Sequence, residues 1–355
     1  MKTLLLAPAL FASEGGIERV MRVTLKALCD SAQNDDVIEL AALNDRNFPS
    51  ERMAPYSNQR LSRKLGGNRR RVFFFLQAVR ACLRCDRVVI GHFHLLPVVS
   101  LAQRLKPSLR AHMFAHGIEL WRTWKPSEQS AVRRGVNLLS ISEFTRRRIL
   151  EKCPGLAPEK INILSCPLDP TRPHDISEEP TRPGLILTVS RLSSDDRYKG
   201  IDHLIEAMPL ITEHMPGAQL RIVGKGDDRP RLEQLAAQHA PNAVQFAGFV
   251  PDEKMPGEYA RAHAFALPSR DEGFGLVYIE AFLQGTPCIA ANAGAAPELV
   301  RPEFGALAEH GDVRGLAKAC LDVMNRQWDT SQLKAHAARY SYPVFAARLT
   351  ELISA

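Results

Sequence analysis

Two carboxylates and a glycine-containing turn are the part of this sequence best suited to chemistry. Glu272 opens the segment E-G-F-G at residues 272–275, and Glu280 follows it within a predicted helix. The glycines let the backbone approach a ligand closely, and the free N–H groups at a helix start suit a phosphate. The helical rise puts the carboxylates roughly 10 Å apart, unlike the close pair of a glycosidase. This spacing suits a nucleotide sugar, which has hydroxyl groups at both ends and a diphosphate between them.

Two cations extend this prediction. Arg191 and Lys199 follow the predicted strand 185–189, in a loop where they could neutralise a diphosphate through charge-assisted hydrogen bonds. The next predicted strand, 219–223, ends in another glycine-bearing loop, G-K-G-D at residues 224–227. Parallel strands bring such loops to one edge of a sheet, where ligands bind.

Short apolar runs alternate with amphipathic stretches along the chain, which predicts parallel sheets covered by helices on both faces. A stretch with five prolines, 167–184, interrupts this alternation and indicates a domain junction. We therefore expect an α/β protein with two doubly wound Rossmann-like domains facing each other across a deep cleft. The predicted bounds are 1–168 for the first domain, 169–184 for the linker and 185–339 for the second domain, with a C-terminal helix at about 340–355 that packs back on the first. The strands are predicted at 3–6, 37–42, 87–90, 111–114, 136–140, 161–164, 185–189, 219–223, 244–246, 264–267 and 287–290.

The charge of this 355-residue chain is unevenly spread. Residues 1–177 carry a net charge of +12 and residues 178–355 a net charge of −5. A basic half indicates an anionic partner. The absence of a nucleic-acid-binding motif argues against nucleic acid, which leaves an anionic membrane surface, a phosphate-bearing acceptor, or a solvated basic face with no partner. Phe73-Phe74-Phe75 beside arginines fits either a buried helix face or a peripheral membrane contact.

Other features favour structural roles. The start M-K-T-L-L-L-A-P reads as a buried strand better than as a secretory signal, because the amphipathic helix after it needs that strand to pack on. Cys82-x-x-Cys85 is interpreted as two packed thiols, since no second cysteine pair accompanies it. His92 and His94 share one face, but the sequence places no third metal ligand near them. No apolar window reaches the length of a membrane span.

Taken together, these residues resemble the family 4 glycosyltransferases of the GT-B fold. The resemblance rests on E-G-F-G-L-x4-E, on R-L-x6-K-G and on the G-x-G-D loop. It extends in the right order over most of the chain, through the motifs at Gly15–Glu18, His116–Glu119, Ser142–Thr145 and Gly294–Glu298.

The resemblance implies a role for each matching residue. Arg191 and Lys199 bind the diphosphate and stabilise the leaving nucleotide, Glu272 contacts hydroxyls of the donor sugar, and Glu280 binds the ribose hydroxyls. His116 points into the cleft near the reaction centre. The donor is further contacted by the backbone of glycine loops and of the helix start, at Gly15, Gly16, Gly224, Gly226, Gly273, Phe274, Gly275 and Leu276.

The resemblance also implies a reaction. Family members transfer a hexose from a UDP- or GDP-sugar to a hydroxyl group with retention of configuration, and they need no metal and no other cofactor. The departing phosphate oxygen helps to deprotonate the acceptor. Together with the basic N-terminal half, this leads us to expect a saccharide acceptor, lipid-diphosphate-linked, at the cytoplasmic face of the cell membrane, in polysaccharide assembly.

One departure and several alternatives accompany this expectation. Cys166 stands before Pro167 where the family usually has Asn, which puts a donor contact there in doubt. A UDP-N-acetylglucosamine 2-epimerase shares the fold, although the spacing of Glu272 and Glu280 fits the transferases better. A non-catalytic nucleotide-sugar-binding or regulatory protein would keep the same pocket. A periplasmic sugar receptor would require the secretory signal.

Overall fold

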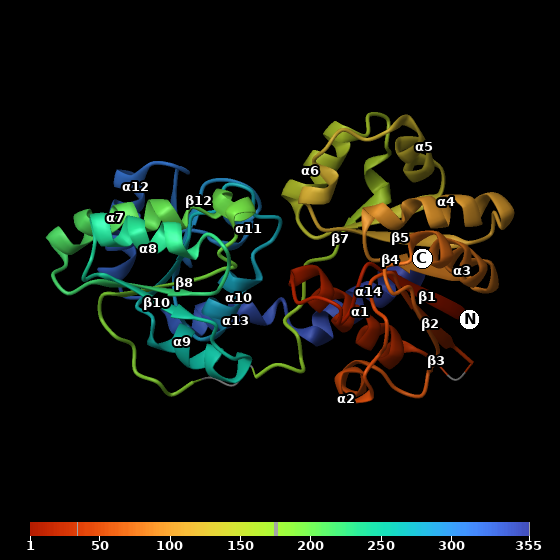
Figure 1. The fold of residues 1–355 in the computed structure, drawn as a ribbon, viewed down its shortest axis with the longest axis horizontal. Helices are drawn as coiled ribbons and strands as arrows, with labels where there is room; N and C mark the ends of the chain where they lie inside the picture. Colours follow the sequence, from red (N-terminus) through yellow and green to blue (C-terminus); the bar gives the residue numbers. More distant parts are fainter. Residues whose placement is uncertain (34, 174–176, 355) are drawn as a thin grey trace. The chain divides into compact units, whose positions relative to one another are not determined.

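The chain divides into two compact units with one parallel sheet each (Figure 1). The computed structural model describes residues 1–33, 35–173 and 177–354. The first unit comprises Met1–Thr171 and the segment that begins at Ser341, and the second is Arg172–Tyr340. Most of the predicted linker thus belongs to the second unit, and its residues 174–176 lie outside the described residues. Two Rossmann-like α/β units agree with the predicted fold class, and the cleft between them stays a prediction.

The first unit is built on a seven-stranded parallel sheet in the order β3-β2-β1-β4-β5-β6-β7. Its strand order reverses between β1 and β4, so the loops after these two strands flank the switch point where such sheets bind ligands. The strands are β1 (Lys2–Ala7), β2 (Val37–Ala42), β3 (Leu61–Gly66), β4 (Arg87–Ile90), β5 (Arg110–Ala115), β6 (Val136–Ser140) and β7 (Ile161–Ile163).

Helices cover both faces of this first sheet. Side chains of α3 and α4 pack with Val88, Ile90 and Met113 of the sheet in one apolar core. On the other face α1 packs against α14, which brings the end of the chain back to the first unit (Figure 1). The helices are α1 (Gly16–Ser31), α2 (Ser50–Met53), α3 (Arg71–Arg84), α4 (Leu96–Leu105), α5 (Pro126–Gly135), α6 (Glu143–Lys152) and α14 (Tyr342–Ser354).

The second unit repeats this plan with a six-stranded parallel sheet in the order β10-β9-β8-β11-β12-β13, which reverses between β8 and β11. Helices α7, α8 and α12 lie on one face, and α9, α10 and α13 lie on the other (Figure 1). The strands are β8 (Leu185–Val189), β9 (Gln219–Val223), β10 (Val244–Gly248), β11 (Ala264–Leu267), β12 (Cys288–Ala291) and β13 (Gly305–Ala308). The helices are α7 (Ile201–His214), α8 (Arg229–His239), α9 (Met255–Arg261), α10 (Leu276–Leu283), α11 (Ala296–Leu299), α12 (Val313–Met324) and α13 (Thr330–Ala338).

Two edge strands escaped the sequence prediction. Strand β3 reads L-S-R-K-L-G, and its central side chains are exposed, so it lacks the apolar run of a buried strand. Strand β13 reads G-A-L-A and is too short and too small in its side chains to form a recognisable run. Both pair with a neighbour on one side only, and an edge strand buries less apolar surface than a central one.

The phenylalanine cluster and the cysteine pair lie on α3 or just after it. Phe74 is buried in the core, as the buried-face alternative predicts, while Phe73 is 54% exposed; the membrane contact stays a prediction. Cys82 and Cys85 are free, buried thiols, as predicted. Burial raises the pKa of Cys82 to about 12. Within the described ranges, no helix is both long and apolar enough to cross a bilayer.

Candidate active site

The second unit gathers its candidate site residues at the switch point of its sheet. Arg191 and Lys199 follow β8, and Glu272 follows β11, the strand that pairs with β8. Parallel pairing places the carboxyl ends of both strands at one edge, so the loops emerge side by side. The structure thereby brings together the cations and the first carboxylate that the sequence singled out separately.

Lys199 and Glu272 form the ion pair at the centre of this cluster. Lys199 Nζ lies 3.3 Å from Glu272 Oε2, and the side chains are 19% and 17% exposed. Burial lowers the pKa of the Lys199 ammonium, but the charge of Glu272 and the nearby Tyr198 outweigh it, so that this pKa lies above its usual range. The lysine is therefore a permanent cation, oriented by a carboxylate and partly open to a ligand.

Backbone contacts hold these two loops against each other. The amide of Arg270 donates to the carbonyl oxygen of Tyr198 at 2.9 Å, directly before Lys199. Gly200, at a φ of +69°, lies so close to Pro268 that a β-carbon would stand 2.7 Å from the Pro268 carbonyl oxygen. The K-G pair is thus explained by geometry, since the lysine reaches Glu272 while the glycine permits the approach of the loops.

The loop of Arg191 is paired with the glycine loop after β9. Leu192 N donates to Lys225 O at 3.0 Å, and a β-carbon on Gly226 would collide with the Leu192 carbonyl oxygen. Gly224 lies equally close to the Ser190 carbonyl oxygen, which a β-carbon on this glycine would also meet. Both glycines are therefore needed for the loops to pack, whether or not they also contact a ligand.

Two aspartates fix this loop pair. Arg191 Nε donates to Asp196 Oδ2 at 2.7 Å, and this hydrogen bond raises the pKa of the guanidinium. Arg191 is nevertheless 71% exposed. Asp227, the last residue of G-x-G-D, accepts hydrogen bonds from the amide and the hydroxyl of Ser194, at 3.2 and 2.6 Å. The aspartates therefore orient the loops, and the arginine remains accessible to a ligand.

The turn from Glu272 into α10 requires its glycines. Gly275 has a φ of +100°, and a β-carbon there would collide with the ring of Tyr278. Gly294 packs on the backbone of Glu272, and the next residue, Ala295, donates its amide to the Glu272 carbonyl oxygen at 2.9 Å. Gly273, Phe274 and Leu276 complete the turn, with Phe274 buried. Leu276 begins α10, and the amide of Tyr278 donates to the Gly275 carbonyl oxygen at 3.0 Å, so the helix start is closed by a tight turn directly after Glu272.

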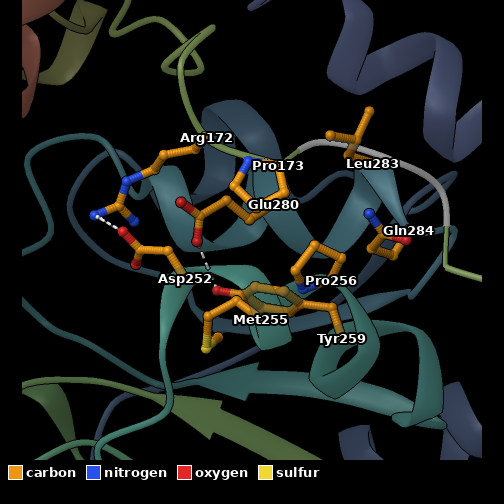
Figure 2. A pocket seen from close by; sticks show the side chains of 9 residues that line it. All are labelled: Arg172, Pro173, Asp252, Met255, Pro256, Tyr259, Glu280, Leu283 and Gln284. Carbon is orange, nitrogen blue, oxygen red and sulfur yellow. Dashed lines mark hydrogen bonds and ion pairs between the residues drawn. The ribbon is translucent and has the colours of Figure 1, made fainter.

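Glu280 lies in a separate pocket on α10. The Tyr259 hydroxyl donates to Glu280 Oε2 at 2.8 Å, and Figure 2 shows that this carboxylate points toward the tyrosine. Arg172 and Asp252, 2.7 Å apart in an ion pair, line the same pocket. Sequence reasoning identified Glu280 but missed Tyr259, Arg172 and Asp252, because no motif connects residues so far apart in the chain.

The first unit positions the remaining predicted residues at the carboxyl edge of its own sheet. Gly15 and Gly16 stand at the start of α1, after β1, and Glu18 lies against Gly15. His116 follows β5, is 8% exposed, and its Nε2 lies 3.0 Å from the carbonyl oxygen of Gly91, after β4. Burial lowers the pKa of His116 to about 4. Its imidazole is therefore neutral at physiological pH.

The two histidines of H-F-H follow β4. The rings of His92 and His94 lie 4.6 Å apart, and His92 Nδ1 accepts a hydrogen bond from the amide of His94. In the part of the chain that the structure describes, no group of three or more histidines, cysteines, aspartates or glutamates could hold a metal ion.

Comparison with known proteins identifies relatives of this chain. Residues 171–342 match the protein family described as glycosyl transferases group 1. A GDP-mannose-dependent monoacylated alpha-(1-6)-phosphatidylinositol monomannoside mannosyltransferase of Corynebacterium glutamicum is 31% identical over 261 residues, which cover 67% of this chain and 68% of the relative. A GDP-mannose-dependent alpha-(1-6)-phosphatidylinositol monomannoside mannosyltransferase of Mycobacterium tuberculosis is 29% identical over 292 residues, 72% of this chain and 73% of the relative.

Solved structures share the fold at lower identity. The UDP-glucose complex of Anabaena Alr3699/HepE superposes with a TM-score of 0.75 at 21% identity, over 100% of this chain and 99% of that chain. The apo form of the lipopolysaccharide outer core galactosyltransferase WaaB superposes with a TM-score of 0.76 at 16% identity, also over 100% of this chain and 99% of that chain. These neighbours establish the two-domain GT-B architecture.

Proposed function

The chain belongs to the group 1 glycosyl transferases, and from this membership we propose that it transfers a hexose, first of all mannose from GDP-mannose, to a hydroxyl group of a lipid-linked saccharide. The observation that carries the proposal is the Lys199–Glu272 pair between the glycine loops at the β8–β11 switch point. Two relatives use GDP-mannose, according to their names, which places this donor before UDP-sugars.

The donor diphosphate would be held by the cations of the second unit. Lys199 is a permanent cation and Arg191 is largely exposed, so both can meet phosphate oxygens. The positive end of the α10 dipole would add charge of the same sign. These groups would stabilise the charge that develops on the leaving nucleotide, which lowers the barrier because the interaction strengthens in the transition state.

The two glutamates would bind hydroxyl groups at different places. One oxygen of Glu272, Oε2, is paired with Lys199, and the second oxygen would accept a hydrogen bond from a sugar hydroxyl beside the diphosphate. Glu280, together with the Tyr259 hydroxyl, offers acceptors for the two ribose hydroxyls. Neither carboxylate is proposed as a covalent nucleophile. Retention of configuration would follow from displacement on one face of the sugar, with the leaving phosphate oxygen accepting the acceptor's proton.

Metal independence is part of the proposal, because Lys199, Arg191 and the helix amides would supply the positive charge that the leaving diphosphate needs. Turnover with GDP-mannose should therefore be unchanged by a chelator. A requirement for added Mg²⁺ or Mn²⁺ would contradict this part of the proposal.

The direct test is a calorimetric titration with GDP, UDP, GDP-mannose and UDP-glucose in the presence of a chelator, followed by assays of turnover. Micromolar binding of GDP and GDP-mannose, with slow donor hydrolysis, supports the proposed transferase. Preference for UDP would change the donor. Tight binding without hydrolysis or transfer would favour the non-catalytic protein, and formation of a 2-epimer from UDP-N-acetylglucosamine would favour the epimerase.

We further propose that α3 brings the enzyme to the inner face of the cell membrane. Val72, Phe73 and Leu76 on this helix are 79%, 54% and 54% exposed, and the exposed arginines 69–71 precede them. Apolar side chains beside cations suit an interface with anionic lipids. This site would give access to a lipid-linked acceptor.

Vesicle sedimentation tests the α3 contact. Binding to vesicles of phosphatidylglycerol and phosphatidylcholine should weaken as salt rises, because exposed charges are screened. The double variant Val72→Ser, Phe73→Ser should bind several-fold less. The variant Val344→Ser, which changes an exposed valine on α14, is the matched control. Equal binding by all three proteins would refute the membrane contact at α3.

A further inference from the structure

Two arginines meet at the amino-terminal edge of the first sheet, opposite the edge that carries the glycine loop and His116. Arg87 is the first residue of β4 and Arg110 is the first residue of β5, and the two are paired in the sheet register. Thr3 of β1 pairs with Arg87 from the other side. Paired residues point to the same face of a sheet, so both guanidinium groups lie on the face that α1 and α14 cover.

The two guanidinium groups converge on one sulfur atom. Arg87 Nη2 and Arg110 Nη2 each lie 3.2 Å from Met1 Sδ. Arg110 is exposed, and its Nη1 also donates to the carbonyl oxygen of Ser354 at 3.5 Å. A thioether is a weak acceptor. Arg87 is only 4% exposed, and its buried Nε has no hydrogen-bond partner. Among residues 1–33, 35–173 and 177–354, no carboxylate lies within ion-pair distance of either guanidinium, so two neighbouring cations share a ligand that carries no charge.

The nearest carboxylates are engaged with other groups. Asp36 Oδ1 lies 2.9 Å from the amino group of Met1, and its Oδ2 accepts from the amide of Gln33 at 3.0 Å. Asp86 accepts from the amide of Lys2 at 2.8 Å. Burial, and after it the charge of Arg110, lowers the pKa of Arg87. An anion between the arginines would remove this repulsion.

A buried histidine on the same face also lacks hydrogen-bond partners. His112 lies two residues after Arg110 on β5, so its side chain projects from the same face. It is 1% exposed, and neither ring nitrogen has a hydrogen-bond partner. Burial, followed by the charges of Arg87 and Arg110, lowers its pKa to about 4. Arg87 Nε and the two His112 nitrogens are thus buried polar atoms without partners, which is costly.

An open pocket adjoins Arg87. Its volume is about 280 Å³, and its polar walls are Thr3, Ser31, Gln33, Asp36, Arg87, Thr350 and Ser354. The Asp36 carboxylate is paired with the Met1 amino group. Arg110 does not line the pocket but contacts Met1, which does. Ser31 and Gln33 come from the end of α1 and the residues after it, and Thr350 comes from α14. The pocket is larger than a single phosphate and offers several hydroxyl and amide groups beside the cations.

We propose that this pocket is a binding site for the phosphate group of a small molecule, with Arg87 in its wall and Arg110, behind Met1, as the two cationic ligands. The phosphate oxygens would replace the Met1 sulfur between the guanidinium groups and form charge-assisted hydrogen bonds with both. Thr3, Ser31, Gln33 and Thr350 would contact the remainder of the ligand. The site shares no residue with the proposed donor site and does not depend on the proposed function.

Calorimetric titration with inorganic phosphate, and separately with glycerol 3-phosphate, tests this site. We expect one site per chain whose affinity falls roughly tenfold in Arg110→Gln and at least as much in Arg87→Gln, because each loses a charged hydrogen-bond donor. Arg104→Gln, on exposed α4, and Lys199→Ala, in the donor site, should bind as the natural protein does. Tighter binding of glycerol 3-phosphate than of phosphate would indicate that the polar wall residues contact the part of the ligand outside its phosphate group.

Phosphate binding that is absent, that persists unchanged in both arginine variants, or that disappears in Lys199→Ala would overturn the proposal. A second measurement covers the case in which Arg87→Gln folds poorly. Without ligand, Arg87→Met should be at least as stable as the natural protein, because it removes a buried cation that lacks a counterion. Phosphate should raise the melting temperature of the natural protein but not that of Arg87→Met. Lower stability of Arg87→Met, with no effect of phosphate on either protein, would show that Arg87 serves folding alone.

Discussion

In the second unit the cations of the candidate active site each face a carboxylate, whereas the two arginines at the amino edge of the first sheet face each other. Lys199 is held by Glu272 and Arg191 by Asp196. Arg87, which is buried, and Arg110, which is exposed, both donate to the sulfur of Met1, and Arg110 also donates to the Ser354 carbonyl oxygen. A carboxylate partner fixes the direction of a cation before a ligand arrives, while an unpaired buried cation leaves its charge for the ligand. Lys199 and Arg191 are therefore oriented before a ligand arrives, whereas Arg87 is not oriented by a carboxylate.

The largest expected effect follows from removing the preorganised cation. Lys199→Ala should lower turnover roughly 100- to 1,000-fold, as removal of one transition-state donor does in other enzymes, with the fold intact by circular dichroism. Lys318→Ala, which removes an exposed lysine paired with Asp322 on α12, is the matched control. Normal turnover by Lys199→Ala would show that the Lys199–Glu272 pair is purely structural. The difference between the paired cations of the second unit and the two arginines of the first would then have no functional consequence.

Replacing one glycine by alanine in each unit compares how tightly the glycine loops of the two units pack. Gly226→Ala should destabilise the protein by about 3 kcal/mol, because its β-carbon would collide with the Leu192 backbone. Gly16→Ala meets no atom within 4 Å and should leave stability unchanged. Urea denaturation measures both. A loss of activity in Gly16→Ala without a loss of stability would support a backbone contact with the donor, and a stable Gly226→Ala would refute the packing role of its loop.

Acid should affect the first unit through its buried histidines. The pKa values of His92, His112 and His116 each lie near 4, chiefly because of burial, while the unfolded chain binds these protons below about 6.5. Stability therefore falls as the pH drops from 6.5 toward 4, by about 2 kcal/mol per histidine at pH 5.

Tryptophan fluorescence distinguishes the unfolding of the first unit from that of the second. Trp124 reports on the first unit and Trp328 on the second, so Trp328→Phe isolates the first. In urea, the midpoint of the first unit should fall between pH 7 and pH 5. An unchanged midpoint would mean that these histidines titrate normally in the folded state.

The smallest effect concerns the second glutamate. Glu280→Gln should weaken donor binding about tenfold, since a charged acceptor becomes a neutral one, with a smaller effect on the rate constant for bound donor. Tyr259→Phe removes the hydrogen bond to Glu280 and should produce part of the same loss. Calorimetry with GDP measures both variants. If Glu280→Gln bound GDP as tightly as the natural protein, this pocket would not be the ribose site.

Sequence patterns located most of the fold because buried parallel strands are short apolar runs. Eleven predicted strands match β1, β2 and β4 to β12, including the edge strands β7 and β10. The edge strands β3 and β13 escaped, because β3 exposes its central side chains and β13 is short with small side chains. Arg191 and Glu280 were identified from their motifs. Their partners Asp196 and Tyr259 were not, because a partner depends on loop conformation and on contacts that no short motif encodes.

The sequence by itself determined which backbone positions must be glycine and which side chains carry charge. Gly226 and Gly275 occupy places where a β-carbon would meet another atom, and the residue type records that local constraint. Tertiary structure alone decided that Lys199 meets Glu272, 73 residues away, and that Arg87 meets Arg110. Those contacts arise from the pairing of β8 with β11 and of β4 with β5. Strand order is a property of the whole sheet, because the position of each strand depends on how all the strands together bury their apolar side chains.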